Sequence, residues 1–129
     1  MKLNNDCVRD ILLTLEEVCT FENKFIYDIA SPPPHLLEEY SREEVLYHIR
    51  QCEHSALLLE PLYYYGGNLV EISDLSPSGH EYLANIRSDN IWNKTKKVAS
   101  EIGATSLSAM VQISSQIITA IIKSQFGLT

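Results

Sequence analysis

Residues 41–83, SREEVLYHIRQCEHSALLLEPLYYYGGNLVEISDLSPSGHEYL, decide the fold. Ser41 and Glu44 form the pattern of a capping box, in which each side chain satisfies a free amide at the start of a helix. Apolar runs at residues 58–65 and 69–72 flank a Gly-Gly-Asn sequence, and glycines between two such runs are typical of a hairpin turn. The stretch therefore predicts a helix followed at once by a two-strand hairpin.

A further helix follows the hairpin. Ser76 is a typical N-cap, and Pro77 is favoured in the first helical position. The helical pattern continues toward Gly103, a natural stop, either straight or with a bend near residues 88–90. Upstream of the hairpin, the short apolar run at residues 25–27 predicts an edge strand that pairs with it.

These elements predict the fold class. Helix, β-wing and helix in succession form the skeleton of a winged-helix domain, and apolar residues at helical spacing place another helix near the N-terminus. We predict a mostly α fold with a small β-hairpin. A winged-helix-like domain covers residues 1–103, and a C-terminal helix, expected to mediate oligomerisation, covers residues 104–129.

Charge is distributed unevenly along the chain. The net charge is −7 over 129 residues, and residues 1–60 hold five basic residues against twelve acidic ones. Residues 61–129 are balanced, so the half with the expected recognition helix carries the whole excess. DNA binding draws most of its affinity from cations on phosphates, so this acidity disfavours nucleic acid as a partner.

The chemistry-bearing residue types do not form a known catalytic or metal-binding pattern. The chain has three cysteines, Cys7, Cys19 and Cys52, and no visible secretion signal. An odd number of cysteines in such a sequence predicts reduced thiols in a cytoplasmic protein. His48 and Cys52 share a helix side, but a zinc site generally needs further ligands. We expect no metal, no cofactor and no enzymatic activity.

The last apolar segment, residues 106–126, predicts a helix about 31 Å long. Its glutamines, hydroxyls and Lys123 argue against a membrane span. A small domain covers one side of so apolar a helix, so the rest is expected to form a homo-oligomer interface. The alternative is packing on its own domain only. The predicted interface residues are Leu107, Met110, Val111, Ile113, Ile117, Ile118, Ile121 and Ile122.

A partner-binding surface is predicted on the helix at residues 42–55 and on the hairpin. Exposed tyrosines anchor protein partners, although they also occur in ordinary strand packing. The predicted partner-binding residues are Glu43, Glu44, Tyr47, His48, Arg50, Gln51, His54, Tyr64 and Tyr65. If the helix instead enters a DNA groove, the nucleic-acid contacts would be Arg42, Arg50, Gln51, Lys94, Lys96 and Lys97. A solvated charged face is the simpler interpretation of both sets.

Three segments carry a resemblance: LNNDCVRDIL from Leu3, YSREEVLYHI from Tyr40, and LSPSGHEYL from Leu75 together with NIRSDNIW from Asn85. With them the chain resembles short bacterial and prophage proteins catalogued as a domain of unknown function. The middle of the chain is more loosely similar to winged-helix transcription regulators, which often have glycine where Ala56 follows the recognition helix.

The resemblance brings no catalytic residues or cofactor with it. A prophage origin, which the resemblance alone implies, makes a host protein a reasonable target. We therefore expect a non-enzymatic protein that acts by protein–protein contact as a homo-oligomer. The alternatives are a dimeric DNA-binding regulator and, less favoured, a small-ligand sensor with a pocket in the oligomer core.

Overall fold

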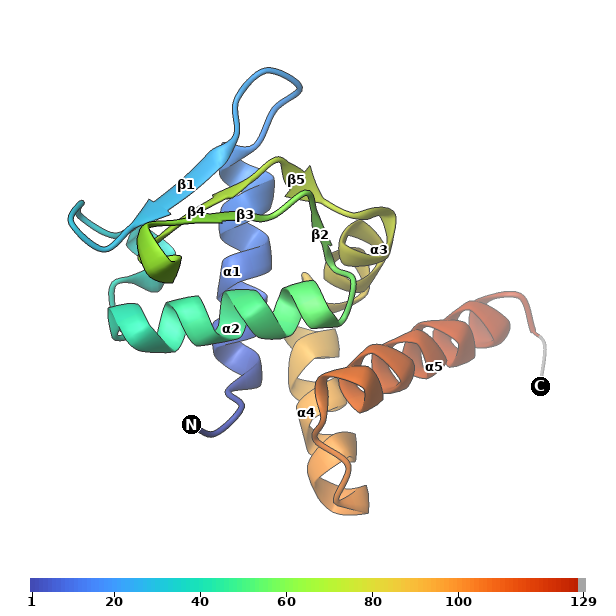
Figure 1. Ribbon diagram of the computed structural model, residues 1–129. Coiled ribbons are helices and arrows are strands. Elements are labelled where there is room, and N and C mark those ends of the chain that lie inside the picture. Colours follow the sequence, from blue (N-terminus) through green and yellow to red (C-terminus); the bar gives the residue numbers. More distant parts are fainter. Residues whose placement is uncertain (128–129) are drawn as a thin grey trace. The chain divides into compact units, whose positions relative to one another are not determined.

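The predicted fold class is confirmed in a computed structural model that describes residues 1–127 (Figure 1). Five α-helices, two single 3-10 turns and five short strands follow one another in these residues. In chain order they are α1 (Asn5–Val18), β1 (Phe25–Asp28), η1 (His35–Leu37), α2 (Arg42–His54), β2 (Leu58–Leu59), β3 (Leu62–Tyr64), η2 (Tyr65–Gly67), β4 (Leu69–Ile72), β5 (Asp74–Leu75), α3 (Pro77–Ile86), α4 (Asp89–Ile102) and α5 (Leu107–Gln125).

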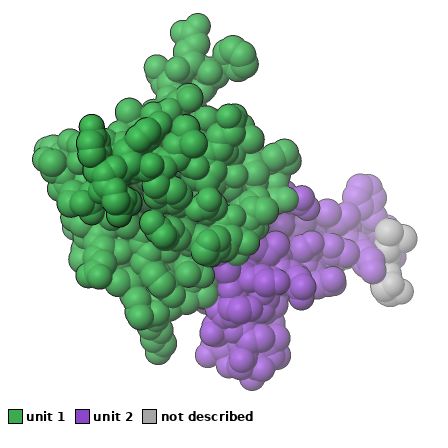
Figure 2. Space-filling model, in the orientation of Figure 1, with its two compact units in different colours: residues 1–80 green, residues 81–129 purple. Residues whose placement is uncertain are grey.

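The chain forms two compact units, coloured separately in Figure 2. The first unit covers residues 1–80, from α1 to the start of α3. The second unit begins at Glu81 and contains the rest of α3 with α4 and α5. The domain boundary predicted after Gly103 falls in the turn between α4 and α5, inside the second unit.

The first unit is built around a three-stranded antiparallel sheet in the order β1-β4-β3. The expected pairing of the residue 25–27 strand with the hairpin is confirmed, with Tyr27 opposite Val70 on β4 and Tyr63 on the other side of Val70. The single strand predicted at residues 58–65 is wrong. Glu60 adopts a φ of +51° before a proline, which breaks that run into β2 and β3, and β2 pairs with β5 instead.

Helix α1 lies behind the strands in Figure 1 and packs against α2, η1 and β5. Asn4 caps it, because the Asn4 Oδ1 accepts the amides of Asp6 and Cys7 at 3.0 and 3.2 Å. The buried stripe of α1 and the inner face of the sheet both contribute to the apolar core. The helix residues are Cys7, Val8, Ile11, Leu12 and Leu15, and the sheet residues are Phe25, Tyr27, Val70 and Ile72.

Ala56 ends α2 in a conformation that usually requires glycine. Its φ is +59°, and the Leu57 amide donates to the Cys52 carbonyl at 3.0 Å while the Ala56 amide donates to Glu53 at 2.9 Å. These two bonds define a Schellman motif with Ala56 in the left-handed position. Ala56 therefore differs from the glycine of winged-helix regulators in residue type, and the exit geometry is the one glycine favours.

Helix caps define the second unit. The Ser88 hydroxyl accepts the Ile91 amide at 3.2 Å and caps α4, so of the two alternatives for the helical pattern after Pro77 the straight helix is wrong. The interruption falls near the bend expected at residues 88–90 and separates α3 from α4. Gly103, at a φ of +70°, ends α4 as predicted, and Ser106 caps α5. Within residues 1–127, no single helix is long and apolar enough to span a membrane. Only α4 and α5 together meet that criterion, and they are bent by 120°.

Candidate functional site

The outward face of the β1-β4-β3 sheet carries apolar side chains. The register places Ile26, Glu71 and Leu62 in one row across the strands, and Asp28, Leu69 and Tyr64 in the next. Ile26 is 56% exposed, Leu62 47% and Tyr64 43%. The solvated face of an antiparallel sheet is normally polar, so this face is a candidate binding surface. We call Ile26, Leu62, Tyr64, Leu69 and the adjoining Tyr65 the sheet patch.

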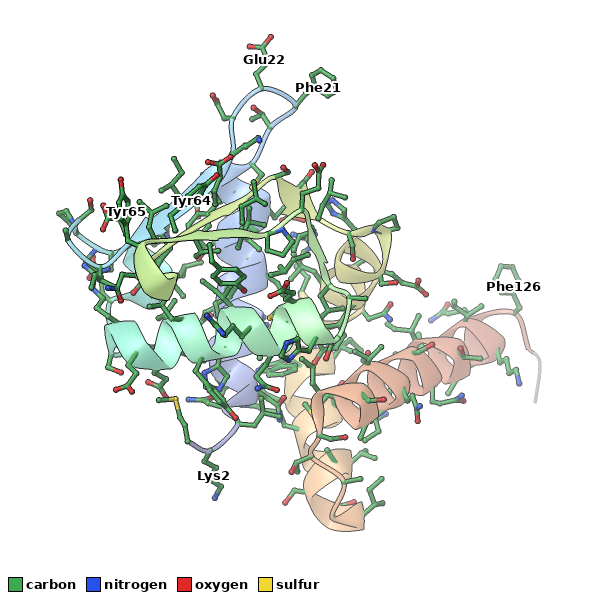
Figure 3. The ribbon with its side chains drawn as sticks, viewed as in Figure 1. Lys2, Phe21, Glu22, Tyr64, Tyr65 and Phe126 are labelled. Carbon is green, nitrogen blue, oxygen red and sulfur yellow. The ribbon has the colours of Figure 1, made fainter. Side chains whose placement is uncertain are left out.

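Tyr64 and Tyr65 lie where the prediction of an exposed tyrosine pair requires. Figure 3 shows both at the end of β3, and Tyr65 is 81% exposed with a φ of +53°. Tyr63 points to the other side, as strand alternation demands, and its hydroxyl donates to Glu53 Oε1 at 2.7 Å. Burial, with the Glu53 hydrogen bond, raises the pKa of Tyr63 above its usual value.

Acidic groups and a hollow border the sheet patch. Asp28 and Glu71 share its outward face, and Lys24 Nζ lies 3.1 Å from Glu71 Oε1. Lys24 also lines a cavity of about 310 Å³, beside the exposed Phe21 that Figure 3 marks at the tip of the α1–β1 turn. The cavity lining, Thr20, Phe21, Lys24, Leu59, Glu60, Ser73 and Asp74, combines apolar surface with two carboxylates.

The sequence did not identify Ile26, Leu62 and Leu69 as surface residues. Each lies in a strand whose apolar residues occupy both faces, so alternation gives no polar face to distinguish. The one available signal is strand alternation in the run Phe25-Ile26-Tyr27, which places Ile26 on the face opposite to Phe25 and Tyr27. Which of the two faces is covered depends on what packs against the sheet, and sequence spacing does not supply that.

His48 was wrongly predicted to face a partner. Its side chain is fully buried, with Nε2 accepting the Asn4 amide at 2.8 Å and Nδ1 placed 2.8 Å from the Glu44 carbonyl. Since Nε2 accepts and Nδ1 donates, the ring is the neutral tautomer. Val45, Ile49 and Cys52 form the same buried stripe, so His48 completes the i, i+3, i+4, i+7 face that the sequence assigned to apolar residues alone.

The other predicted residues of α2 remain at the surface to different degrees. Glu43, Arg50 and His54 are exposed, whereas Glu44, Tyr47 and Gln51 are half-buried. The Arg50 guanidinium lies over the Tyr63 ring at 4.9 Å. Arg42, expected as a nucleic-acid contact, places its guanidinium 5.3 Å over the Tyr27 ring and donates to the Ser31 carbonyl. Both arginines therefore contribute to packing within the first unit.

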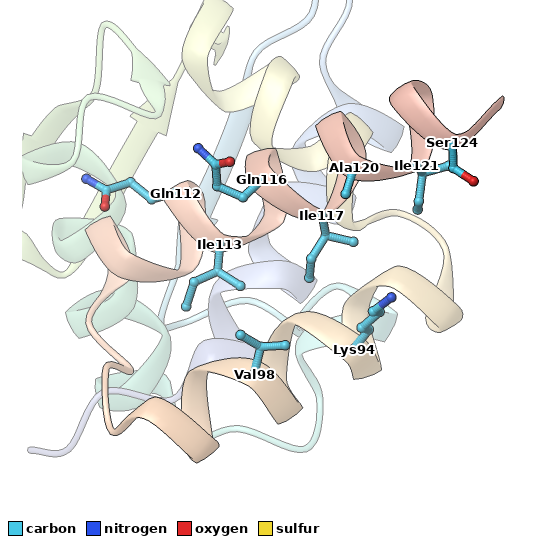
Figure 4. Close-up of a pocket in the computed structure, with 9 residues that line it drawn as sticks. All are labelled: Lys94, Val98, Gln112, Ile113, Gln116, Ile117, Ala120, Ile121 and Ser124. Carbon is cyan, nitrogen blue, oxygen red and sulfur yellow. The ribbon is translucent and has the colours of Figure 1, made fainter. Parts of the chain in front are cut away.

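The predicted lysine contacts all lie on α4 and do not form one face. Lys94 and Lys97 are exposed, and Lys96 is half-buried with Nζ 5.5 Å from the Trp92 ring. Lys94 lines a groove of about 580 Å³ between α4 and α5 (Figure 4). The three lysines therefore divide between an aromatic contact, a groove and open solvent.

The predicted oligomerisation residues of α5 divide into two groups. Leu107 and Met110 are buried within the chain, so their assignment to an interface between copies is wrong, whereas Ile117 is largely buried but also lines the groove between α4 and α5. They are covered because α5 packs against α4. For this part of the helix, packing within the same chain was the alternative expectation. The residues that keep exposed or half-exposed apolar surface are Val111, Ile113, Ile118, Ile121 and Ile122.

The described residues offer neither an activated cysteine nor a cluster of metal ligands. All three cysteines are free thiols. Burial is the largest cause that raises the pKa of Cys7 to about 12, so this thiol stays protonated and a poor nucleophile. Within residues 1–127, no group of three or more His, Cys, Asp or Glu side chains could hold a metal ion.

Comparisons with known proteins place the chain in a family. No solved structure matches it. A protein of Haemophilus influenzae named "Uncharacterized protein" is 32% identical over 122 residues, which cover 92% of this chain and 97% of the relative. Residues 2–106, the segment that ends just before α5, match the family described as "Hypothetical protein (DUF2513)". The chain therefore belongs to the DUF2513 family, a family defined by a domain of unknown function.

Proposed function

We propose that this protein acts by binding another protein through the sheet patch, without catalysis. The observation that carries the proposal is the exposure of Ile26, Leu62 and Tyr64 on one sheet face. Contiguous exposed apolar residues on a soluble protein mark interaction sites, and tyrosine is enriched among the residues that dominate binding energy. Tyr65, presented at the end of β3, extends the same surface.

The charges around the sheet patch indicate the chemistry of the partner. Asp28 lies within the patch rows with Glu71, which is paired with Lys24, and Glu60 and Asp74 line the adjacent cavity, so carboxylates outnumber the one lysine. A partner that offers an apolar surface bordered by lysine or arginine would match both features. Such complementarity speeds encounter and selects among partners more than it adds affinity.

We further infer that the first unit is a winged-helix-like module that binds protein in place of DNA. Helix α2, the β3–β4 hairpin and the start of α3 follow one another in the order that this fold requires. The nucleic-acid alternative needs free cations on α2 and the hairpin, but Arg42 and Arg50 lie over tyrosine rings and His48 is buried and neutral. This leaves Arg50 as the exposed arginine of α2, and a single arginine gives a phosphate backbone little to bind there.

The experiment first traps the partner and then measures its affinity. A photo-reactive benzoylphenylalanine at position 64 cross-links whatever covers the patch in living cells. Binding of the purified partner is then compared between wild type, an Ile26→Ser/Leu62→Ser variant and the matched control Gln51→Ser/His54→Ser on α2. We expect the sheet variant to bind about 10- to 100-fold more weakly, since it removes two partly exposed apolar side chains. The control should bind as wild type does.

Two results would reject the proposal. Wild-type affinity in the sheet variant, with loss in the α2 control, would move the site to the outward face of α2. No cross-linked partner, together with tight binding of random-sequence DNA that weakens steeply with salt, would favour the DNA-binding regulator. Circular dichroism of each variant checks that a change in binding does not reflect unfolding.

A further inference from the structure

The second half of α5 lacks cover from the described residues of its own unit. Its last buried residue is Ile117, and Ile121, Ile122 and Phe126 are 37%, 50% and 77% exposed. Two to three helical turns gain little stability from backbone propensity alone, and helices in proteins depend on a packed apolar face. These turns therefore need a covering surface outside the chain's own second unit.

A groove runs along the same part of the helix. Val98 from α4 and Ile113, Ile117 and Ile121 from α5 line it (Figure 4), and its volume is about 580 Å³. The groove is more open than enclosed, whereas small-molecule sites bury most of their ligand. An open apolar groove beside a helix suits a second amphipathic helix, which is a common recognition mode.

The charges identify which helix fits. Helix α5 carries one charged residue, Lys123, and no carboxylate, in a chain whose net charge is −7. Two copies that approach through their acidic halves repel each other, but α5 faces avoid that repulsion. A helix with an unfilled groove and exposed apolar side chains on adjacent faces also meets the self-complementarity that a two-fold interface demands.

We propose that a second copy of this chain fills the groove, with the two α5 helices antiparallel and the two-fold axis near Ala120. Ala120 lines the groove and is small, so the helix backbones can approach closely. Antiparallel helices set opposite dipole ends together, and they keep the two Lys123 ammonium groups apart. An axis at Ala120 also sets Gln116 of each copy beside Ser124 of the other, where amide and hydroxyl can hydrogen-bond.

The oligomeric state tests the proposal on the purified full-length chain, independently of any foreign partner. Ile121→Glu places a carboxylate in the groove, and Thr119→Glu places the same charge on the polar side of α5 as the control. Burial of one isoleucine strengthens the dimerisation constant at least about tenfold, and a two-fold interface buries two copies of Ile121. We expect Ile121→Glu to weaken dimerisation about 100-fold in sedimentation equilibrium, while Thr119→Glu stays within a few-fold of wild type.

Cysteine cross-linking tests the antiparallel arrangement. In a Cys19→Ser background, Ala120→Cys should form an intermolecular disulfide under mild oxidation, and Thr119→Cys should not. A wild-type chain that remains monomeric at high concentration would overturn the proposal, and a monomer that binds dodecanoate in the groove would assign the site to an amphiphile instead. Cross-linking through position 119 but not 120 would overturn the proposed axis.

Discussion

Replacement of the buried His48 provides the sharpest test of how α2 is used. The ring links two parts of the first unit, because Nε2 accepts the Asn4 amide at the start of α1 while Nδ1 donates to Glu44 within α2. Asn4 is itself the N-cap of α1. Loss of the imidazole therefore removes packing from the core and a restraint from the first turn of α1.

The magnitude follows from these contacts. An amide left without its acceptor in a partly buried site costs about 1–3 kcal/mol. The cavity left by truncation to alanine in a fully buried position adds about 2 kcal/mol, at the lower end of large-to-small core changes. His48→Ala should therefore lower the free energy of unfolding by about 3–5 kcal/mol. His48→Leu, which keeps the volume, should cost only the hydrogen-bond part, about 1–3 kcal/mol.

Urea unfolding followed by far-ultraviolet circular dichroism measures both variants. His54→Ala is the matched control, since His54 is an exposed histidine in the last turn of the same helix. Its stability should stay within about 0.5 kcal/mol of wild type. The reasoning fails if His48→Ala unfolds at the wild-type urea concentration, because neither contact would then contribute to stability. It also fails if His48→Leu and His48→Ala lose the same free energy of unfolding, because the cavity would then add nothing to the cost of the lost hydrogen bond.

Three further changes test the backbone and the titratable groups. Ala56→Gly should raise the free energy of unfolding by about 0.5–1 kcal/mol, measured in urea, because the left-handed φ of +59° strains a Cβ. Gly79→Ala should cost more than about 3 kcal/mol by the same assay, because its Cβ would lie 2.1 Å from the Leu57 carbonyl oxygen, while Ser78→Ala serves as the mild control. Burial raises the pKa of Asp10 above its usual value of about 4, against the lowering effect of the Tyr40 hydroxyl, so the folded chain holds this proton more tightly than the unfolded chain. The Asp10 contribution to stability is therefore fully present below pH 4 and is lost as pH rises through the folded pKa. In unfolding measured from pH 4 to pH 7, Asp10→Asn should lack this loss of stability, which wild type should show.

Local signals in the sequence were sufficient for most of the helix ends and for one strand of the hairpin. The predicted caps Ser41 and Ser76 both accept the amide three residues ahead, as Ser88 and Ser106 also do, and the strand Leu69–Ile72 has its predicted bounds. Each of these features depends on a few neighbouring residues, which is why spacing and residue type suffice. The division of residues 58–65 into two strands depends instead on pairing with two different partners, β5 for β2 and β4 for β3, which lie outside the run.

The candidate sites were less accessible to prediction for the same reason. Helical spacing places His48 on the buried face, but residue type alone suggested a polar surface, and only the distant Asn4 amide explains why the core accepts an imidazole. The sheet patch depends on register across three strands. Leu107 and Met110 show the opposite case, in which an apolar stripe was correctly recognised but its cover could not be assigned to the same chain or to a second copy.

The two proposals rest on opposite electrostatic properties within one chain. The sheet patch contains Asp28 and Glu71 within its rows and adjoins the carboxylates of Glu60 and Asp74, so it favours a basic partner over another copy of this acidic chain. Helix α5 has no carboxylate, so its apolar surface lacks that repulsion and accepts another copy. If a two-fold pair forms through α5, each assembly presents two sheet patches, and a partner with two matching surfaces would bind it more tightly than a partner with one. Disruption of α5 with Ile121→Glu should then weaken capture of a two-site partner while leaving the affinity of each sheet patch unchanged.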